Sequence, residues 1–181
     1  MRPMSVIRIL AVSGSLRAAS SNTHLLQAAR RLAPESVELQ LYEGLGCLPH
    51  FNPDLDGEAP PRAVLELRTE IGKAQGLLIC SPEYARGVPG SLKNALDWLV
   101  SCGEFPDKPV ALFNASQRST HAQESLRLTL QTMSARLIEA ACITVPLLGT
   151  KLDASGIAAD AAFGPQVRAA LVRFAEAITS P

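Results

Sequence analysis

Short apolar runs alternate with amphipathic stretches along most of the chain. Five runs rich in leucine and β-branched residues predict buried strands, at Val6–Ser13, Val37–Tyr42, Gly76–Ser81, Pro109–Ser116 and Cys142–Leu148. Apolar residues at helical spacing predict four helices between these strands and one after the last strand. They are expected at Thr23–Ala33, Arg62–Ala74, Gly90–Val100, His121–Ala135 and Gln166–Thr179. This alternation is typical of βαβ units wrapped around a parallel sheet.

Right-handed crossovers leave few topologies for five such strands. The favoured one is an α/β fold, a flavodoxin-like three-layer sandwich with a five-stranded parallel sheet. The second and fifth runs are partly polar or interrupted by Pro146, so we expect them at the sheet edges. No linker or repeat divides the chain, which predicts one domain over residues 1–181. Ligands of such sheets bind outside the carboxyl ends of the strands, so the loops after strands one, three and four are the candidate sites.

The composition of the chain limits the kinds of partner that we expect it to have. The net charge is +0, with 17 basic and 17 acidic residues interspersed and only 4% aromatic residues, so we expect no nucleic-acid partner. No apolar run approaches the roughly 18 residues that span a bilayer, and "MRPMSVIRIL" lacks the features of a signal peptide. We therefore expect a cytoplasmic protein with no membrane partner. The four cysteines are far apart without a C-x-x-C pair, and no metal site is predicted.

The loop after the first strand, "GSLRAASSN", has the composition of a phosphate site. Gly14 permits close backbone approach, and a helix N-terminus supplies unpaired N–H groups. Hydrogen-bonding side chains follow in Ser15, Arg17, Ser20, Ser21 and Asn22. Neither G-x-x-x-x-G-K-[ST] nor G-x-G-x-x-G is present, which leaves a monophosphate as the natural ligand. Asn22 or Ser21 can also cap the helix that follows. The alternative to a phosphate site is a serine-rich helix N-cap beside a solvated arginine.

The loop after the third strand, within "SPEYARGVPGSLKNALDW", is stiffened by two prolines and two glycines. Tyr84 lies at its tip, and such a rigid loop can present backbone N–H groups and an aromatic edge to a flat ligand such as a flavin ring. In the helix that follows, Leu92, Leu96 and Leu99 mark the buried face, and we expect Trp98 to serve packing or a subunit contact.

Together the two loops resemble the NAD(P)H-dependent FMN reductase family of flavodoxin-like quinone, azo-dye and chromate reductases. The motif G-S-L-R-x-x-S-x-N is matched by Gly14, Ser15, Leu16, Arg17, Ser20 and Asn22. The motif P-E-Y-N-x-x-x-P-G-x-L-K-N-A-[IL]-D-W is matched by Pro82, Glu83, Tyr84, Pro89, Gly90 and the run Leu92–Trp98. "LPHFNPDL" resembles the family's loop after strand two. One departure is Ala85, which stands where the family often has asparagine.

The resemblance implies FMN and NADPH (or NADH) as cofactors, with hydride passed through FMN to a small-molecule electron acceptor by a ping-pong mechanism. The acceptors would be quinones, azo compounds, chromate or free flavin. The flavin phosphate would lie on the first loop and the ring against Pro82–Ala85. The residues that would bind the cofactor are Ser15, Leu16, Arg17, Ser20, Ser21, Asn22, Pro82, Glu83, Tyr84, Ala85, Ser116 and Gln117. No catalytic acid or base is required, because the chemistry belongs to the cofactor. A homodimer or homotetramer is also implied.

Two further features have open interpretations. Arg86 and Arg118 lie in the ligand-side loops, where they would either meet the extra phosphate of NADPH or remain solvated charges or intersubunit pairs. The long segment Glu43–Pro60 either lines the site or joins a subunit interface.

Two other functions compete with the reductase. A flavin-binding electron carrier without its own NAD(P)H oxidation is disfavoured, because a net charge of +0 offers no long-range field for steering to a partner. A phosphate-ester hydrolase would need an activated nucleophile, and the sequence shows no general base for Ser15.

Overall fold

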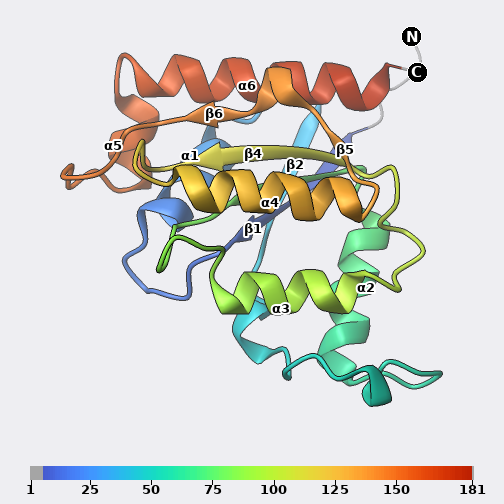
Figure 1. Ribbon diagram of the computed structural model, residues 1–181. Helices are drawn as coiled ribbons and strands as arrows, with labels where there is room; N and C mark the ends of the chain where they lie inside the picture. Colours follow the sequence, from blue (N-terminus) through green and yellow to red (C-terminus); the bar gives the residue numbers. More distant parts are fainter. Residues whose placement is uncertain (1–5, 181) are drawn as a thin grey trace, which may run out of the picture.

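The computed structural model describes residues 6–180, which form a parallel sheet between two layers of helices (Figure 1). The strands are β1 (Ile7–Ser13), β2 (Val37–Tyr42), β3 (Gly76–Cys80), β4 (Pro109–Asn114), β5 (Arg136–Leu137) and β6 (Ile143–Thr144). Their order is β2-β1-β3-β4-β5, and β6 also pairs with β4. All pairs are parallel, which confirms the flavodoxin-like topology.

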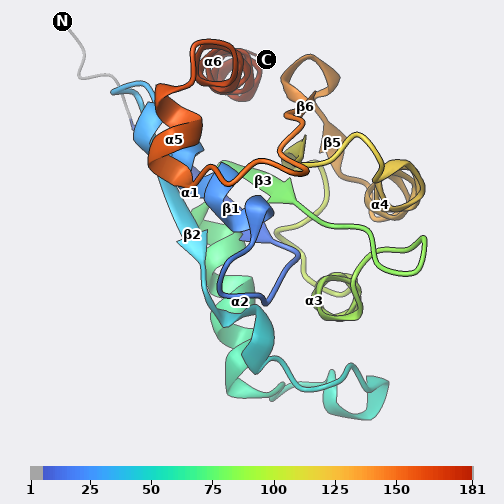
Figure 2. The same ribbon diagram turned by 90° about the vertical axis from the view of Figure 1, so that its left-hand side faces the viewer.

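Helices cover both faces of the sheet, as the edge-on view shows (Figure 2). One layer consists of α1 (Ser21–Leu32), α5 (Ala154–Ala159) and α6 (Phe163–Thr179), and the other of α2 (Arg62–Lys73), α3 (Gly90–Leu99) and α4 (Thr120–Thr132). Each layer has its own apolar core against the sheet. β3 lies between the two cores and every one of its residues is buried, whereas β2 alternates buried and exposed positions, as an edge strand should.

The fifth sheet position differs from the prediction of one strand over Cys142–Leu148. Two short strands share it: β5 pairs with the start of β4, and β6 with its end. A 3-10 turn at Glu139–Ala141 separates them. Opposite this gap, the backbone N–H of Leu112 donates to Cys142 Sγ at 3.3 Å instead of to a strand carbonyl. β6 ends at Thr144, but the chain after it stays bonded to the end of β4: Val145 N donates to Asn114 O at 2.8 Å and Leu147 N to Ala115 O at 3.1 Å. Pro146 between them has no N–H to give.

Five predicted helices are present, with ends within three residues of those expected. α6 begins earlier than Gln166, at Phe163, since Pro165 suits a first turn. Its predicted apolar face is confirmed, with Val167, Leu171 and Phe174 buried. α5 was not predicted: its sequence "ASGIAA" is too short for a periodic pattern, and Asp153 caps it by accepting from Gly156 N at 2.8 Å.

The sheet register brings the candidate loops together. Ser13 at the end of β1 lies opposite Cys80 at the end of β3, and Cys80 lies opposite Phe113 near the end of β4. The loops that follow these strands therefore leave the same edge of the sheet. None of the helices in residues 6–180 is long and apolar enough to cross a membrane.

Candidate functional site

The loop after β1 folds back against the loop after β3. Gly14 N donates to Cys80 O at 2.8 Å, and a Cβ at Gly14 would lie 2.5 Å from Ser81 Oγ. The two loops therefore approach more closely than a side chain at this position permits. The close approach at Gly14 is therefore to the neighbouring loop, and its predicted role beside a phosphate stays a prediction.

The first loop is held in shape by its own hydroxyl groups. Ser15 N donates to Ser13 Oγ at 3.3 Å, Arg17 N donates to Ser15 Oγ at 3.3 Å, and Ser13 Oγ lies 2.8 Å from Thr23 Oγ1 on α1. Ser15 is buried, whereas Arg17 is exposed and free to reach a ligand. The hydroxyl groups thus hold the backbone of the loop in place, and these bonds do not involve the Arg17 side chain.

The start of α1 differs from the predicted capping. Ser20, not Ser21 or Asn22, occupies the N-cap position, and its side chain makes no capping bond. Ser21 and Asn22 lie in the first turn, because the helix begins two residues earlier than its apolar pattern indicated. The uncapped first turn leaves N–H groups and a partial positive charge directed at the loop, as an anion site requires.

Asn22 is oriented from inside the protein. The Cys80 thiol donates to Asn22 Oδ1 at 3.3 Å. Complete burial raises the pKa of Cys80 far above the ordinary thiol value, so the group remains a protonated donor. One buried thiol therefore joins the end of β3 to the first turn of α1, a link that no local sequence pattern indicates.

The loop after β3 is a tight hairpin. Tyr84 N donates to Gly87 O at 3.1 Å and Gly87 N to Tyr84 O at 2.9 Å. The two residues between them, Ala85 and Arg86, have φ angles of 49° and 61°, in the left-handed region that asparagine and glycine tolerate better. Tyr84 is 49% exposed, and its hydroxyl lies 3.5 Å from Ser15 Oγ. The hairpin thus leans toward the first loop.

Between these two loops lies a cavity of about 330 Å³. Its lining combines the first loop, the Tyr84 hairpin and the start of α3: Gly14, Leu16, Arg17, Tyr84, Pro89, Gly90 and Ser91. Leu16, 61% exposed, and Tyr84 supply apolar walls, and Arg17 supplies the positive charge. Of the predicted cofactor residues, the structure brings Leu16, Arg17 and Tyr84 to this cavity, with Ser15 and Ser20 buried in the loop that frames it.

The loop after β4 stands at the same edge but outside this cavity. Asn114 Oδ1 accepts from Ser116 N at 3.0 Å, and Ser116 Oγ accepts from Arg118 N at 3.2 Å. Gln117 is exposed and lines a separate groove of about 450 Å³ between α4 and β6. That Ser116 and Gln117 bind the cofactor stays a prediction.

The segment 43–60 is fastened to α3. Asn94 accepts from Phe51 N at 2.7 Å and donates to Pro49 O at 2.9 Å, and Trp98 Nε1 donates to the same carbonyl at 2.8 Å. The Trp98 ring is fully buried, with the Phe51 ring edge-on at 5.0 Å. The predicted packing role of Trp98 is confirmed, and Asn94 is explained as a clamp on the segment's backbone.

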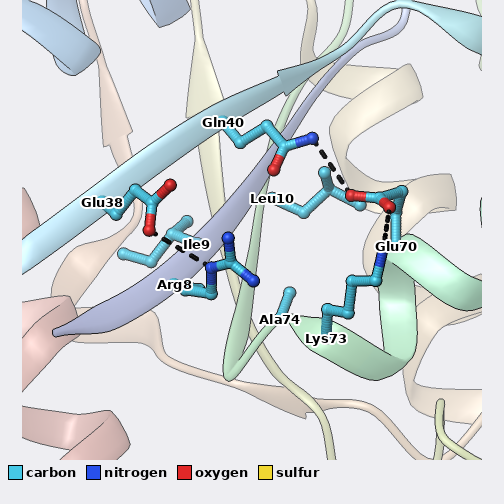
Figure 3. Close-up of a pocket in the computed structure, with 8 residues that line it drawn as sticks. All are labelled: Arg8, Ile9, Leu10, Glu38, Gln40, Glu70, Lys73 and Ala74. Atoms are coloured by element: carbon cyan, nitrogen blue, oxygen red, sulfur yellow. Dashed lines mark hydrogen bonds and ion pairs between the residues drawn. The ribbon is translucent and has the colours of Figure 1, made fainter. Parts of the chain in front are cut away.

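A small hollow at the β2 edge lies apart from the candidate loops (Figure 3). Its charged groups pair with one another: Arg8 with Glu38 at 3.2 Å, and Glu70 with Lys73 at 2.8 Å. Its volume of about 10 Å³ holds no more than about one water molecule. Within residues 6–180, no group of three or more histidine, cysteine or acidic side chains could hold a metal ion.

Comparison with known proteins finds similarity to flavin-dependent reductases in both sequence and structure. Residues 7–147 match the model of the NADPH-dependent FMN reductase family. An NAD(P)H-dependent FMN reductase of Pseudomonas aeruginosa is 34% identical over 83% of both chains. A quinone reductase of Pseudomonas putida is 44% identical over 51% of this chain, and that match spans 49% of its length. Among solved structures, the flavoenzyme NAD(P)H:(acceptor) oxidoreductase FerB from Paracoccus denitrificans has a TM-score of 0.80 and 28% identity, over 96% of this chain and 97% of FerB.

Proposed function

The chain belongs to the NADPH-dependent FMN reductase family, and from this premise we propose that it reduces small-molecule acceptors with NAD(P)H through FMN. The observation that supports this proposal most is the cavity where Arg17, the Tyr84 hairpin and the start of α3 meet. The loop that carries Arg17 leads directly into the uncapped first turn of α1. The acceptors we propose are quinones, azo compounds, chromate or free flavin. The relatives named quinone reductase and FMN reductase support two of these classes.

FMN and NAD(P)H are the cofactors that the family assignment gives, and the residues present fit a flavin phosphate. Gly14 lets the first loop lie close against the loop after β3, and the first loop leads into the uncapped first turn of α1, a favourable position for an anion. We propose that Ser15, Arg17, Ser20 and Asn22 hold the phosphate, and that Pro82–Ala85 supports the ring. Ser21, exposed on the first turn, completes the polar rim.

When bound, FMN supplies the hydride transfer. The residues of the chain bind the cofactor and orient it. Arg17 neutralises the phosphate, and the Ser15 and Tyr84 hydroxyls set the spacing between the two loops. Because the cavity walls at Leu16 and Tyr84 are open to solvent, we propose that the nicotinamide and the acceptor occupy the same place in turn, as a ping-pong mechanism requires.

The experiment that tests this function is a titration of FMN with the purified protein, followed by flavin fluorescence, and then anaerobic addition of NADPH and a quinone. We expect saturable binding, bleaching of the flavin absorbance by NADPH and its recovery with the quinone. Replacing Arg17 with alanine should weaken FMN binding at least roughly tenfold, since a charge-assisted hydrogen bond is worth about 1.5–3 kcal/mol and about 1.4 kcal/mol is tenfold. Arg30→Ala, an exposed arginine on the last turn of α1, is the matched control.

Binding without NADPH oxidation would support the electron-carrier alternative. Release of inorganic phosphate from a generic ester, abolished by Ser15→Ala, would support the hydrolase. Absence of both FMN binding and flavin-dependent NADPH oxidation would refute the reductase.

We also propose a homodimer or homotetramer. Three large apolar side chains are exposed beside one polar network: Leu55 next to Asp56, Val100 next to Ser101, and Leu65 one turn before Arg68. Clustered exposed apolar residues are typical of protein contacts. Light scattering should give a mass of at least 2 chains, and Leu65→Glu combined with Val100→Glu should lower it. The control is Leu128→Glu, a leucine on α4 that is about as exposed as Val100 and more exposed than Leu65.

A further inference from the structure

The helix α4 has no cap of its own. Ser119 occupies the N-cap position with φ −86° and ψ 62°, and its side chain makes no capping bond. The first turn contains no acidic residue. The N–H groups of this turn, which lack partners within the helix, would therefore face the loop uncompensated.

Glu83 supplies the missing cap from a distant part of the chain. Ala122 N, in the first turn of α4, donates to Glu83 Oε2 at 3.0 Å. A carboxylate in this position satisfies an orphan donor and compensates the positive end of the helix dipole. The Glu83 side chain does not line the cavity between the first loop and the Tyr84 hairpin.

The bond joins two candidate cofactor loops. On one side, Glu83 belongs to the Pro82–Ala85 stretch. On the other, α4 continues directly from the loop that carries Ser116 and Gln117, and Ser119 N closes that loop by donating to Ser116 O at 3.2 Å. The next residue, Tyr84, reaches the first loop through Ser15. Two consecutive side chains thus connect the hairpin to the loops on both of its sides.

We propose that Glu83 is a positioning residue, whose carboxylate holds the start of α4, and with it Ser116 and Gln117, in register with Pro82–Ala85. The inference rests on the proposed FMN site. It assigns the Glu83 carboxylate to the protein and not to the ligand. The hairpin's φ angles at Ala85 and Arg86 make this anchor more necessary, because non-glycine residues in the left-handed region persist only when their surroundings hold them.

The test compares Glu83→Ala and Glu83→Gln by FMN titration and thermal denaturation of the flavin-free protein. Glutamine retains an acceptor oxygen for Ala122 N, so it should bind FMN within about twofold of the wild type. Alanine should weaken FMN binding about five- to tenfold, the equivalent of about 1–1.4 kcal/mol for a lost cap. Glu124→Ala removes an exposed carboxylate from the same helix and should leave FMN binding unchanged.

A second variant separates positioning from simple helix stabilisation. Thr120→Asp places an acidic residue on the exposed first turn of α4 and should raise the melting temperature of Glu83→Ala. If Glu83 positions the loops, FMN binding should remain weak in this double variant although its melting temperature recovers. Full recovery of FMN binding together with stability would overturn the proposal, as would wild-type binding by Glu83→Ala. The proposal would also be overturned if Glu83→Gln bound FMN as weakly as Glu83→Ala while keeping the melting temperature of the wild type. The Glu83 charge would then act on the cofactor. If the wild type itself fails to bind FMN, the proposed function fails instead.

Discussion

Gly14 lies where two loops come closer than a side chain allows. A Cβ there would be 2.5 Å from Ser81 Oγ, 2.9 Å from Ser81 Cβ and 3.1 Å from Leu92 Cδ2. Ser81 Oγ is itself bound to Pro82 O at 3.1 Å, which restricts its movement. We expect Gly14→Ala to lower the free energy of unfolding by about 1–3 kcal/mol, as overpacking does, and to weaken FMN binding. Chemical denaturation and flavin titration measure the two effects.

The control for this change is Gly57→Ala. A Cβ at Gly57 would have no heavy atom within 4 Å, so the substitution should leave both quantities nearly unchanged. Equal denaturation midpoints for Gly14→Ala and the wild type would contradict the role assigned to the close approach.

At the residue scale, the sequence identified the loops better than it identified the partners within them. The serines, Arg17 and Tyr84 follow strand ends, and strand ends of a parallel sheet meet at one edge, so their gathering was predictable. The Glu83 bond to Ala122 joins residues 39 positions apart, and the Cys80 bond to Asn22 joins residues 58 apart. No local pattern encodes such pairs, because they depend on which loops the sheet register brings together.

The segment 43–60 is held at its far end by a polar network of Asp56, Arg68 and Ser101, in which Ser101 is exposed and the other two side chains are largely covered. Arg68 Nη2 donates to Asp56 Oδ1 at 2.7 Å, with only 17% and 12% of the two side chains exposed, and Ser101 Oγ donates to Asp56 Oδ2 at 2.6 Å. These bonds, from Ser101 first and then Arg68, hold the pKa of Asp56 below its ordinary value. We expect Asp56→Asn to lower the free energy of unfolding by about 2 kcal/mol at pH 7, the typical strength of hydrogen bonds to a charged group.

The effect of Asp56 should depend on pH in one direction. Its pKa is lower in the folded state, so its stabilisation is fully present above the unfolded pKa near 4 and is lost as the pH falls through the folded value. Urea denaturation across this range should therefore show the wild type and Asp56→Asn converging in acid. Asp54→Asn, at an exposed position in the same segment, is the control and should run parallel to the wild type. A constant difference at all pH values would contradict the assignment.

At the element scale, long periodic segments were predictable and short ones were not. The strands β1 to β4 and the helices with two or more turns of apolar pattern agree with the sequence. β5 and β6 contain 2 residues each, and α5 contains 6. Segments this short have no measurable period, so their structure is decided by tertiary partners such as the edge of β4.

At the scale of the whole molecule, the net charge of +0 leaves no overall field to attract an anionic nucleotide. Any preference for NADPH must then come from individual cations at the site edge. Arg86 and Arg118 are both exposed, in the loops after β3 and β4, and neither forms an ion pair within residues 6–180. We predict that Arg118 meets the extra phosphate of NADPH.

Arg118→Ala should therefore raise the KM for NADPH about tenfold, since a charge-assisted hydrogen bond to phosphate contributes at least about 1.4 kcal/mol, and should leave the KM for NADH nearly unchanged. Steady-state kinetics with both nucleotides at one quinone concentration measure this. Arg30→Ala, far along α1, should change neither constant, which separates a local contact from a change in net charge. Equal increases in the KM for NADPH and for NADH would show that Arg118 contacts a part that the two nucleotides share. If only Arg86→Ala raised the KM for NADPH, the phosphate contact would belong to the hairpin after β3.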